Sequence, residues 1–145
     1  MKKAIFSLLL MAASVIGANA QGSATTAQNP QDVDVLYAKN LLAAGTEAPA
    51  FPALKKGTWT VLDFWATWCP DCRREIPTVK EMFQKYGTRA KFIGVSMDTD
   101  KQKLDNYTQA NGVEWEQYSE FKKWKETQIS KDYKISWLPT CLLYT

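Results

Sequence analysis

The sequence predicts an α/β domain in which helices cover a mainly parallel sheet. Residues 58–68 and 91–97 are almost continuously apolar and rich in β-branched and aromatic residues, as in strands buried on both faces. Amphipathic segments at 70–86 and 101–110 follow these runs and have helical spacing. The chain has 145 residues, 46% hydrophobic and 23% charged, which suits one globular domain. A disordered, collagen-like or multi-pass membrane protein is excluded.

The first twenty residues are predicted to be a secretory signal peptide. Two lysines follow Met1, residues 4–17 are mostly apolar, and Ala18-Asn19-Ala20 fits the small-x-small rule for cleavage. The apolar run is shorter than the ~18–20 residues that span a bilayer. We therefore expect cleavage after Ala20 and export as a soluble protein, with a bacterial periplasm as the destination. Such a compartment permits disulfides.

The remaining chain divides into a tether and one domain. Residues 21–29 are Gly, Ser, Thr, Ala and Gln without apolar periodicity and are expected to form a flexible tether. The domain at 30–145 is expected to start with a helix that Asn29-Pro30 opens and Gly45 ends. Prolines then require extended backbone at 48–52, since residues before proline avoid the helical region.

The other elements follow from start and stop signals along the chain. Gly87 and Asn111-Gly112 end two helices, while Asp98-Thr99-Asp100 and Ser119 are placed to cap others. In order, the expected elements are a turn at 55–57, a strand at 58–68, a helix at 70–86, a strand at 91–97, a helix at 101–110, a strand at 113–118, a helix from 119 to 133 and a strand at 140–144.

Composition excludes several kinds of chemistry. The chain has no histidine, which rules out Ser-His and Cys-His hydrolases and any His-ligated metal site. Three cysteines cannot close a Cys₄ zinc site, so no metal is expected. Eighteen basic and fifteen acidic residues give +3, and losing the two lysines of the signal peptide leaves about +1. That charge is too weak to indicate a nucleic-acid partner.

Trp68-Cys69-Pro70-Asp71-Cys72 places a C-x-x-C pair where a buried strand turns into a helix. Cys69 would be the helix N-cap, where unpaired N–H groups favour a thiolate, and Pro70 suits the first helical position. We expect Cys69 to be exposed and to attack first, and Cys72, one turn deeper, to resolve the mixed disulfide. Two alternatives are a structural disulfide and half of a zinc-binding site. A structural disulfide would usually close a longer loop, and a zinc site would need more cysteine or histidine ligands than the chain has. A redox-active pair is favoured over both.

Residues 61–77, which include Phe64-Trp65-Ala66-Thr67-Trp68-Cys69-Pro70-Asp71-Cys72, resemble the active-site stretch of the thioredoxin superfamily. The similarity is greatest to the exported TlpA/ResA-like thiol–disulfide oxidoreductases. Residues 45–51, 94–98 and 138–140 fall where that family has its other landmarks, so the resemblance covers 45–145. It implies a thioredoxin-like three-layer α/β/α fold with a central mixed sheet.

The resemblance assigns roles to individual residues. It makes Cys69 the nucleophile, Cys72 the resolving thiol and Pro139 the cis-proline that faces the disulfide and orients substrate backbone. Pro77 resembles the proline that kinks the active-site helix, because it lacks an N–H and its ring clashes there. The residues expected to contact substrate are Trp68, Pro70, Leu138, Pro139 and Thr140.

Two acids are candidates for proton transfer. Asp63, six residues before Cys69, matches the buried aspartate of thioredoxins, where TlpA-like proteins more often have Asn. A carboxyl buried in a sheet has a raised pKa, which suits a base that serves Cys72. Glu75, three residues after Cys72, matches an active-site glutamate of ResA-like proteins. Either acid can instead be a structural or solvated side chain, and both interpretations stay open.

Three further features have a plain structural interpretation. Trp65 resembles an active-site aromatic but also fits the core. Cys141, two residues after Pro139, is expected to be a buried, inert thiol rather than a further redox group. Residues 121–125 mix lysines with aromatics and are expected to form a solvated helix face.

The resemblance stops at the C-terminus. The family continues with an antiparallel strand and a closing helix, and the sequence ends at Thr145, so the fold is expected to lack both. The strand at 140–144 would then be a sheet edge, prone to association.

The predicted function is an exported protein thiol–disulfide oxidoreductase. The Cys69–Cys72 pair is itself the redox group, so no metal or organic cofactor is expected. The resemblance implies a reductant of protein disulfides, supplied by a membrane electron donor and linked to cytochrome c maturation. The protein is expected to be a monomer. A thiol peroxidase is an alternative because peroxiredoxins share the 45–51 stretch, but Ala66-Thr67-Trp68-Cys69 does not reproduce their T-x-x-C site. A non-catalytic, truncated thioredoxin-like module is a second alternative.

Overall fold

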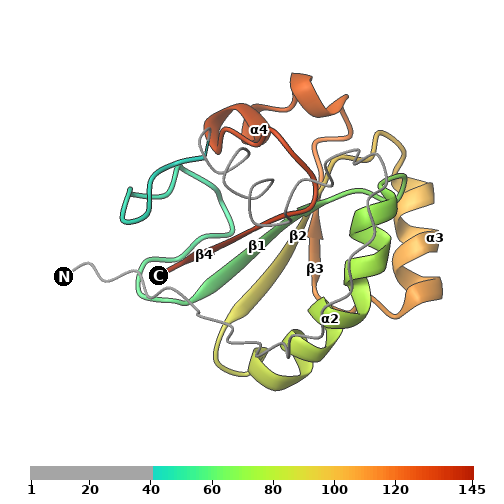
Figure 1. The fold of residues 1–145 in the computed structure, drawn as a ribbon, viewed down its shortest axis with the longest axis horizontal. Coiled ribbons are helices and arrows are strands. Elements are labelled where there is room, and N and C mark those ends of the chain that lie inside the picture. Colours follow the sequence, from blue (N-terminus) through green and yellow to red (C-terminus); the bar gives the residue numbers. More distant parts are fainter. Residues whose placement is uncertain (1–40) are drawn as a thin grey trace, which may run out of the picture.

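A computed structural model describes residues 41–145. The predicted signal peptide, the predicted tether and most of the expected first helix lie outside the described residues. The elements, shown in Figure 1, are β1 (Thr60–Trp65), α2 (Pro70–Tyr86), β2 (Lys91–Ser96), α3 (Lys101–Asn111), β3 (Glu116–Tyr118), the 3₁₀ turn η1 (Trp124–Glu126), α4 (Gln128–Asp132) and β4 (Thr140–Tyr144). Among the helices of this part of the chain, none is both long and apolar enough to cross a membrane.

The four described strands form one mixed sheet in the order β3-β2-β1-β4. β1 pairs in parallel with β2, which pairs in parallel with β3, while β4 runs antiparallel to β1. The central mixed sheet predicted from the sequence is therefore confirmed. Within residues 41–145, β4 is an edge strand, as expected.

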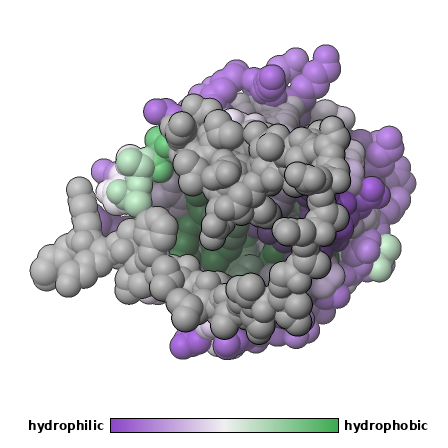
Figure 2. Space-filling model, in the orientation of Figure 1, coloured by the Kyte–Doolittle hydropathy of each residue, from purple (hydrophilic) through white to green (hydrophobic). Residues whose placement is uncertain are grey.

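Helices lie on both faces of this sheet (Figure 1). The ring of Trp65 lies 5.8 Å from Tyr107 of α3, on the face that carries α2 and α3. The ring of Phe64, which points the other way, lies 5.5 Å from Tyr133 at the end of α4. The three-layer arrangement follows from this alternation. In Figure 2 the outer sides of α3 and of the η1–α4 segment are mostly hydrophilic.

The predicted bounds of α2 and α3 are confirmed almost to the residue. Pro70 occupies the first turn of α2, where a missing N–H costs nothing, and Gly87 follows its last turn. Asp100 caps α3 by accepting a hydrogen bond from the Lys103 N–H at 3.1 Å. Gly112 ends α3 with φ +59°, a left-handed conformation that favours glycine.

The continuous helix expected from 119 to 133 is wrong. Ser119 accepts a hydrogen bond from the Phe121 N–H at 3.1 Å, and Phe121 has φ +51°, so the chain turns instead of coiling. Only η1 and the five-residue α4 follow. The N–H groups of Gln128 and Ile129 donate to the Glu120 carboxylate at 3.0 and 2.9 Å, which caps α4 from a distance. Residues 121–125 are therefore not a helix face, although their lysines are exposed.

Candidate active site

The Cys69–Cys72 disulfide lies where β1 gives way to α2, with 5.3 Å between the two Cα atoms. Cys69 is the N-cap of α2, and its Sγ accepts a hydrogen bond from the Cys72 N–H at 3.2 Å. The N-cap assignment is thereby confirmed. Cys69 is only 5% exposed and Cys72 2%, so the expectation of an exposed Cys69 is wrong. Both residues of the disulfide are therefore buried, and Cys69 is slightly the more accessible.

The loop before Cys69 is fixed by Asp98, at the end of β2. Asp98 is buried and accepts hydrogen bonds from the Thr67 N–H at 2.9 Å and from the Thr67 hydroxyl at 2.5 Å. The Ser96 hydroxyl donates to the same carboxylate at 2.7 Å. The sequence analysis placed Asp98 in a helix cap and in the family landmark at 94–98, and it gave this acid no role at the site. The signal missed was an acid directly after a buried parallel strand, at the same sheet edge as the C-x-x-C.

Trp65 belongs to the core. It is 1% exposed, and its indole N–H donates to the side-chain oxygen of Gln117 at 3.0 Å. A Cβ at Gly94 would collide with the Gln117 amide, so glycine there makes room for the contact. Gln117 in turn donates to the Trp115 carbonyl at 3.1 Å. This chain of contacts holds the end of β1 against β3, and no pattern in the sequence indicates the role of Gln117.

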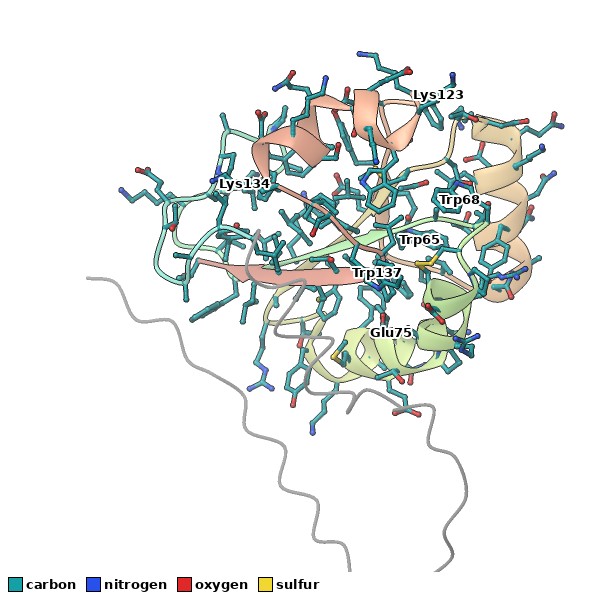
Figure 3. The ribbon with its side chains drawn as sticks, turned by 45° about the horizontal axis from the view of Figure 1, so that its top comes forward. Trp65, Trp68, Glu75, Lys123, Lys134 and Trp137 are labelled. Carbon is teal, nitrogen blue, oxygen red and sulfur yellow. A yellow bond between two sulfur atoms is a disulfide. The ribbon has the colours of Figure 1, made fainter. Side chains whose placement is uncertain are left out.

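Two exposed indoles lie in the part of the molecule that holds the disulfide (Figure 3). Trp68 is 54% exposed, with its ring 6.5 Å from that of Trp124 in η1, and Trp137 is 42% exposed. The Leu138–Pro139 peptide bond is cis, as the family resemblance implied. Of the predicted substrate contacts, Leu138 is buried at 5%. The structure leaves Trp68 and Pro70 exposed and Pro139 and Thr140 half-buried.

The two candidate acids lie close enough to interact. Asp63, on β1, is 4% exposed, and no hydrogen bond reaches its carboxyl group within residues 41–145. Burial, and next the charge of Glu75, raise the pKa of Asp63 to about 7. Glu75 lies exposed on α2, and desolvation raises its pKa as well. The structure thus brings together both acids that the sequence singled out.

Cys141 is a free thiol on β4, directly opposite Asp63 on β1. The residue is exposed on the edge strand, so the expectation of a buried thiol is wrong. Desolvation first, and then the charges of Asp63 and Glu75, nevertheless raise the pKa of the Cys141 thiol to about 12. The thiol therefore stays protonated near neutral pH and is a poor nucleophile. This low reactivity comes from the surroundings of the sulfur atom, although the residue as a whole is exposed.

The described residues contain no group of three or more Cys, Asp or Glu side chains that could hold a metal ion. Within this part of the chain, the reactive groups that remain are the two sulfurs and the two acids. An N-cap cysteine and a second cysteine one turn on are a pair that can carry out thiol–disulfide exchange. A buried acid with a pKa of about 7 can accept or return a proton in that reaction.

Comparisons with known proteins agree with this geometry. A family model described as Thioredoxin-like matches residues 57–144. The thiol-disulfide oxidoreductase ResA of Bacillus cereus is 29% identical over 118 residues, covering 72% of this chain and 65% of ResA.

Solved structures give the same result. A thiol-disulfide oxidoreductase from Bacteroides fragilis aligns with a TM-score of 0.55 and 25% identity, over 59% of this chain and 64% of that one. StoA from Bacillus subtilis aligns with a TM-score of 0.53 and 25% identity, over 61% and 66%. The chain thus spans just under two thirds of these relatives. By the match over 57–144 and by its fold, this chain belongs to the thioredoxin-like family, where it is similar to the ResA-type members.

Proposed function

We propose that this protein is a thiol–disulfide oxidoreductase that reduces disulfides in other proteins. The observation that carries the proposal is the Cys69–Cys72 disulfide at the N-terminus of α2, beside exposed indoles that can receive a polypeptide. The relatives named thiol-disulfide oxidoreductase support it.

The proposed reaction runs in two exchange steps. In the reduced protein the Cys69 thiolate attacks a substrate disulfide, which forms a Cys69–substrate disulfide and releases the first substrate thiolate. Cys72 then loses its proton and attacks the Cys69 sulfur, which releases the second thiolate and re-forms the Cys69–Cys72 disulfide. Two electrons pass from the cysteine pair to the substrate. A dithiol donor must then return two electrons before the next cycle.

Asp63 is the proposed acceptor of the Cys72 proton. Its pKa of about 7 lets it exist in both protonation states near neutral pH, which favours proton transfer in either direction. Glu75 contributes mainly through its charge, which keeps the pKa of Asp63 high.

The setting we propose is extracytoplasmic. The predicted signal peptide supports export to a periplasm, where a reductant needs electrons from a membrane donor. The similarity to ResA-type proteins supports cytochrome c maturation as the process served. We propose that the protein acts as a monomer and that the cysteine pair needs no metal or organic cofactor.

The test combines turnover with a redox potential. Insulin reduction by dithiothreitol should be faster with the wild type and with Glu81→Gln, a change at an exposed residue of α2 that keeps the C-x-x-C pair, and should not be accelerated by Cys69→Ser. Equilibration in glutathione buffers, read by mass spectrometry of alkylated protein, should place the pair near the reducing end of the range of about −270 to −120 mV. A potential near the oxidising end would contradict a reductant, and equal insulin rates for all three proteins would contradict the activity.

A further inference from the structure

Asp63 and Cys141 are cross-strand neighbours. In the antiparallel pairing of β1 with β4, Asp63 is directly opposite Cys141, and Val61 is opposite Leu143. Side chains of directly opposed residues share one face of the sheet, with Cβ atoms about 4.5–5.5 Å apart. The pair therefore lies on the face that also carries α2, the helix of Cys72.

The environment of Asp63 is asymmetric. α2 covers the side of the disulfide, and on β2 the residue in register with Asp63 is Gly94, which has no side chain. On the β4 side, Cys141 and Leu143 are exposed, Leu143 to 57%. Within residues 41–145, Cys141 thus stands between the buried carboxyl group and the outer side of β4.

We propose that Cys141 is a positioning residue for proton transfer: as the exposed cross-strand neighbour of Asp63 on β4, its side chain controls how well that carboxylate is solvated. This inference rests on the proposed function only where Asp63 is taken as the acceptor for Cys72. The control of Asp63 by Cys141 is a separate physical claim that holds whether or not the protein turns over a substrate.

The described residues around Asp63 are consistent with this role. Glu75 approaches from α2 with a like charge, Cys69 and Cys72 are neutral in the disulfide, and Gly94 contributes nothing from β2. The groups that shift the pKa of Asp63 include no cation. Cys141, held protonated, adds no charge of its own. What it supplies is size and polarity, so substitutions that change these should change the affinity of Asp63 for its proton.

The proposed role predicts that a polar and an apolar substitution of Cys141 shift the pH at which Asp63 titrates in opposite directions. Serine is slightly smaller and more polar than cysteine, so Cys141→Ser should stabilise the carboxylate and lower the pH at which Asp63 titrates. Leucine is larger and apolar, so Cys141→Leu should exclude water and raise that pH. If leucine prevents folding, Cys141→Val replaces it, because valine is apolar and close to cysteine in size.

The experiment follows the Asp63 carboxyl carbon by ¹³C NMR across pH 4 to 10 in the oxidised, full-length protein. We expect the serine and the leucine or valine variants to titrate on opposite sides of the wild type, at least about 0.5 pH unit apart, a change of about threefold in proton affinity. Leu143→Ser is the matched control, because it makes a polar change on the same strand and face but opposite Val61. It should leave the Asp63 titration within about 0.2 unit of wild type.

Coincident midpoints for the serine and apolar variants, or an equal shift from Leu143→Ser, would overturn the role of Cys141. A second readout separates this failure from that of the proposed function. The pH midpoint for resolution of a Cys69–substrate disulfide should move in parallel with the NMR midpoint. If the NMR midpoints move and the kinetic midpoints do not, Cys141 still controls Asp63, and Asp63 is removed as the proton acceptor.

Discussion

The backbone N–H of Thr67 donates a hydrogen bond of 2.9 Å to the side chain of Asp98, thirty-one residues further along the chain. This bond joins the loop just before Cys69 to the end of the neighbouring strand β2. Because the carboxylate also accepts from the hydroxyls of Thr67 and Ser96, three donors converge on one buried group. The position of Cys69 at the start of α2 therefore depends on an acid outside the motif.

Asp98→Ala tests that dependence. The substitution leaves the Thr67 N–H without its partner, and a buried donor without a partner costs about 1–3 kcal/mol. We expect urea unfolding to show at least that loss of stability and the Cys69–Cys72 pair to react more slowly with dithiothreitol-reduced peptides. Asp105→Ala is the control, since Asp105 is exposed and forms a surface ion pair with Lys101, so its loss should cost less than about 1 kcal/mol. Equal losses for the two variants would contradict the role of Asp98.

The raised pKa of Asp63 makes stability depend on pH. The ordinary pKa of 3.8 rises to about 7 in the folded protein, so between these values the folded state binds more protons than the unfolded state. The free energy of unfolding must then fall as pH rises from about 4 to 7. Three pKa units correspond to at most about 4 kcal/mol.

Asp63→Asn removes this titration. We expect the variant to be more stable than wild type at pH 8 and to lose most of that advantage at pH 4, where Asp63 is protonated in the folded state and nearly half protonated in the unfolded chain. Thermal unfolding at the two pH values measures the difference. An advantage that is the same at both would mean that Asp63 titrates normally in the folded protein.

Glu75→Gln should lower the pKa of Asp63, because the charge of Glu75 is the second cause of its elevation. Burial is the larger cause, so the midpoint should remain above the ordinary value of 3.8. The Asp63 carbon signal reports the midpoint directly. Glu81→Gln, also exposed on α2, serves as the control and should leave it in place. A midpoint insensitive to Glu75→Gln would show that the two carboxyls do not interact.

Glu120 is predicted to hold α4 in place. Although desolvation opposes it, hydrogen bonds from the N–H groups of Ile129 and Gln128, together with Lys122, lower the pKa of Glu120. Its contribution should be present above about pH 4.5 and be lost as pH falls further. Glu120→Ala should cost about 1 kcal/mol and speed amide exchange at Gln128 and Ile129. Unchanged exchange at these two amides would argue against the cap.

The parts of the fold that could be predicted from the sequence are those with local signals. Pro70, Asp100 and Gly112 mark helix ends through their own backbone chemistry, and the apolar runs of β1 and β2 are long enough to identify buried strands. The prediction of one helix at 119–133 was wrong because the helix that forms there, α4, starts only at Gln128. Its N-terminal N–H groups are capped by Glu120, eight residues earlier, and a contact over that separation leaves no periodic pattern in the sequence.

The site was predicted as far as the family motif extends. Cys69, Cys72 and the cis Leu138–Pro139 bond are where the resemblance placed them. The predictions of an exposed Cys69 and a buried Cys141 were both wrong. The exposure of each residue depends on which segments cover the disulfide and the sheet, and this is set by tertiary packing. The contacts of Asp98 join strands that are distant in sequence, so only the structure shows them.

Trapping a mixed disulfide with Cys72→Ser shows which thiol attacks the substrate, on which the whole proposed reaction depends. The reduced variant is mixed with a peptide that contains one disulfide, quenched with acid, digested and mapped by mass spectrometry. We predict a stable adduct on Cys69, none on Cys141, and none at all when Cys69→Ser is treated in the same way. An adduct located on Cys141, or equal trapping by Cys69→Ser, would contradict Cys69 as the attacking thiol and with it the proposed reaction.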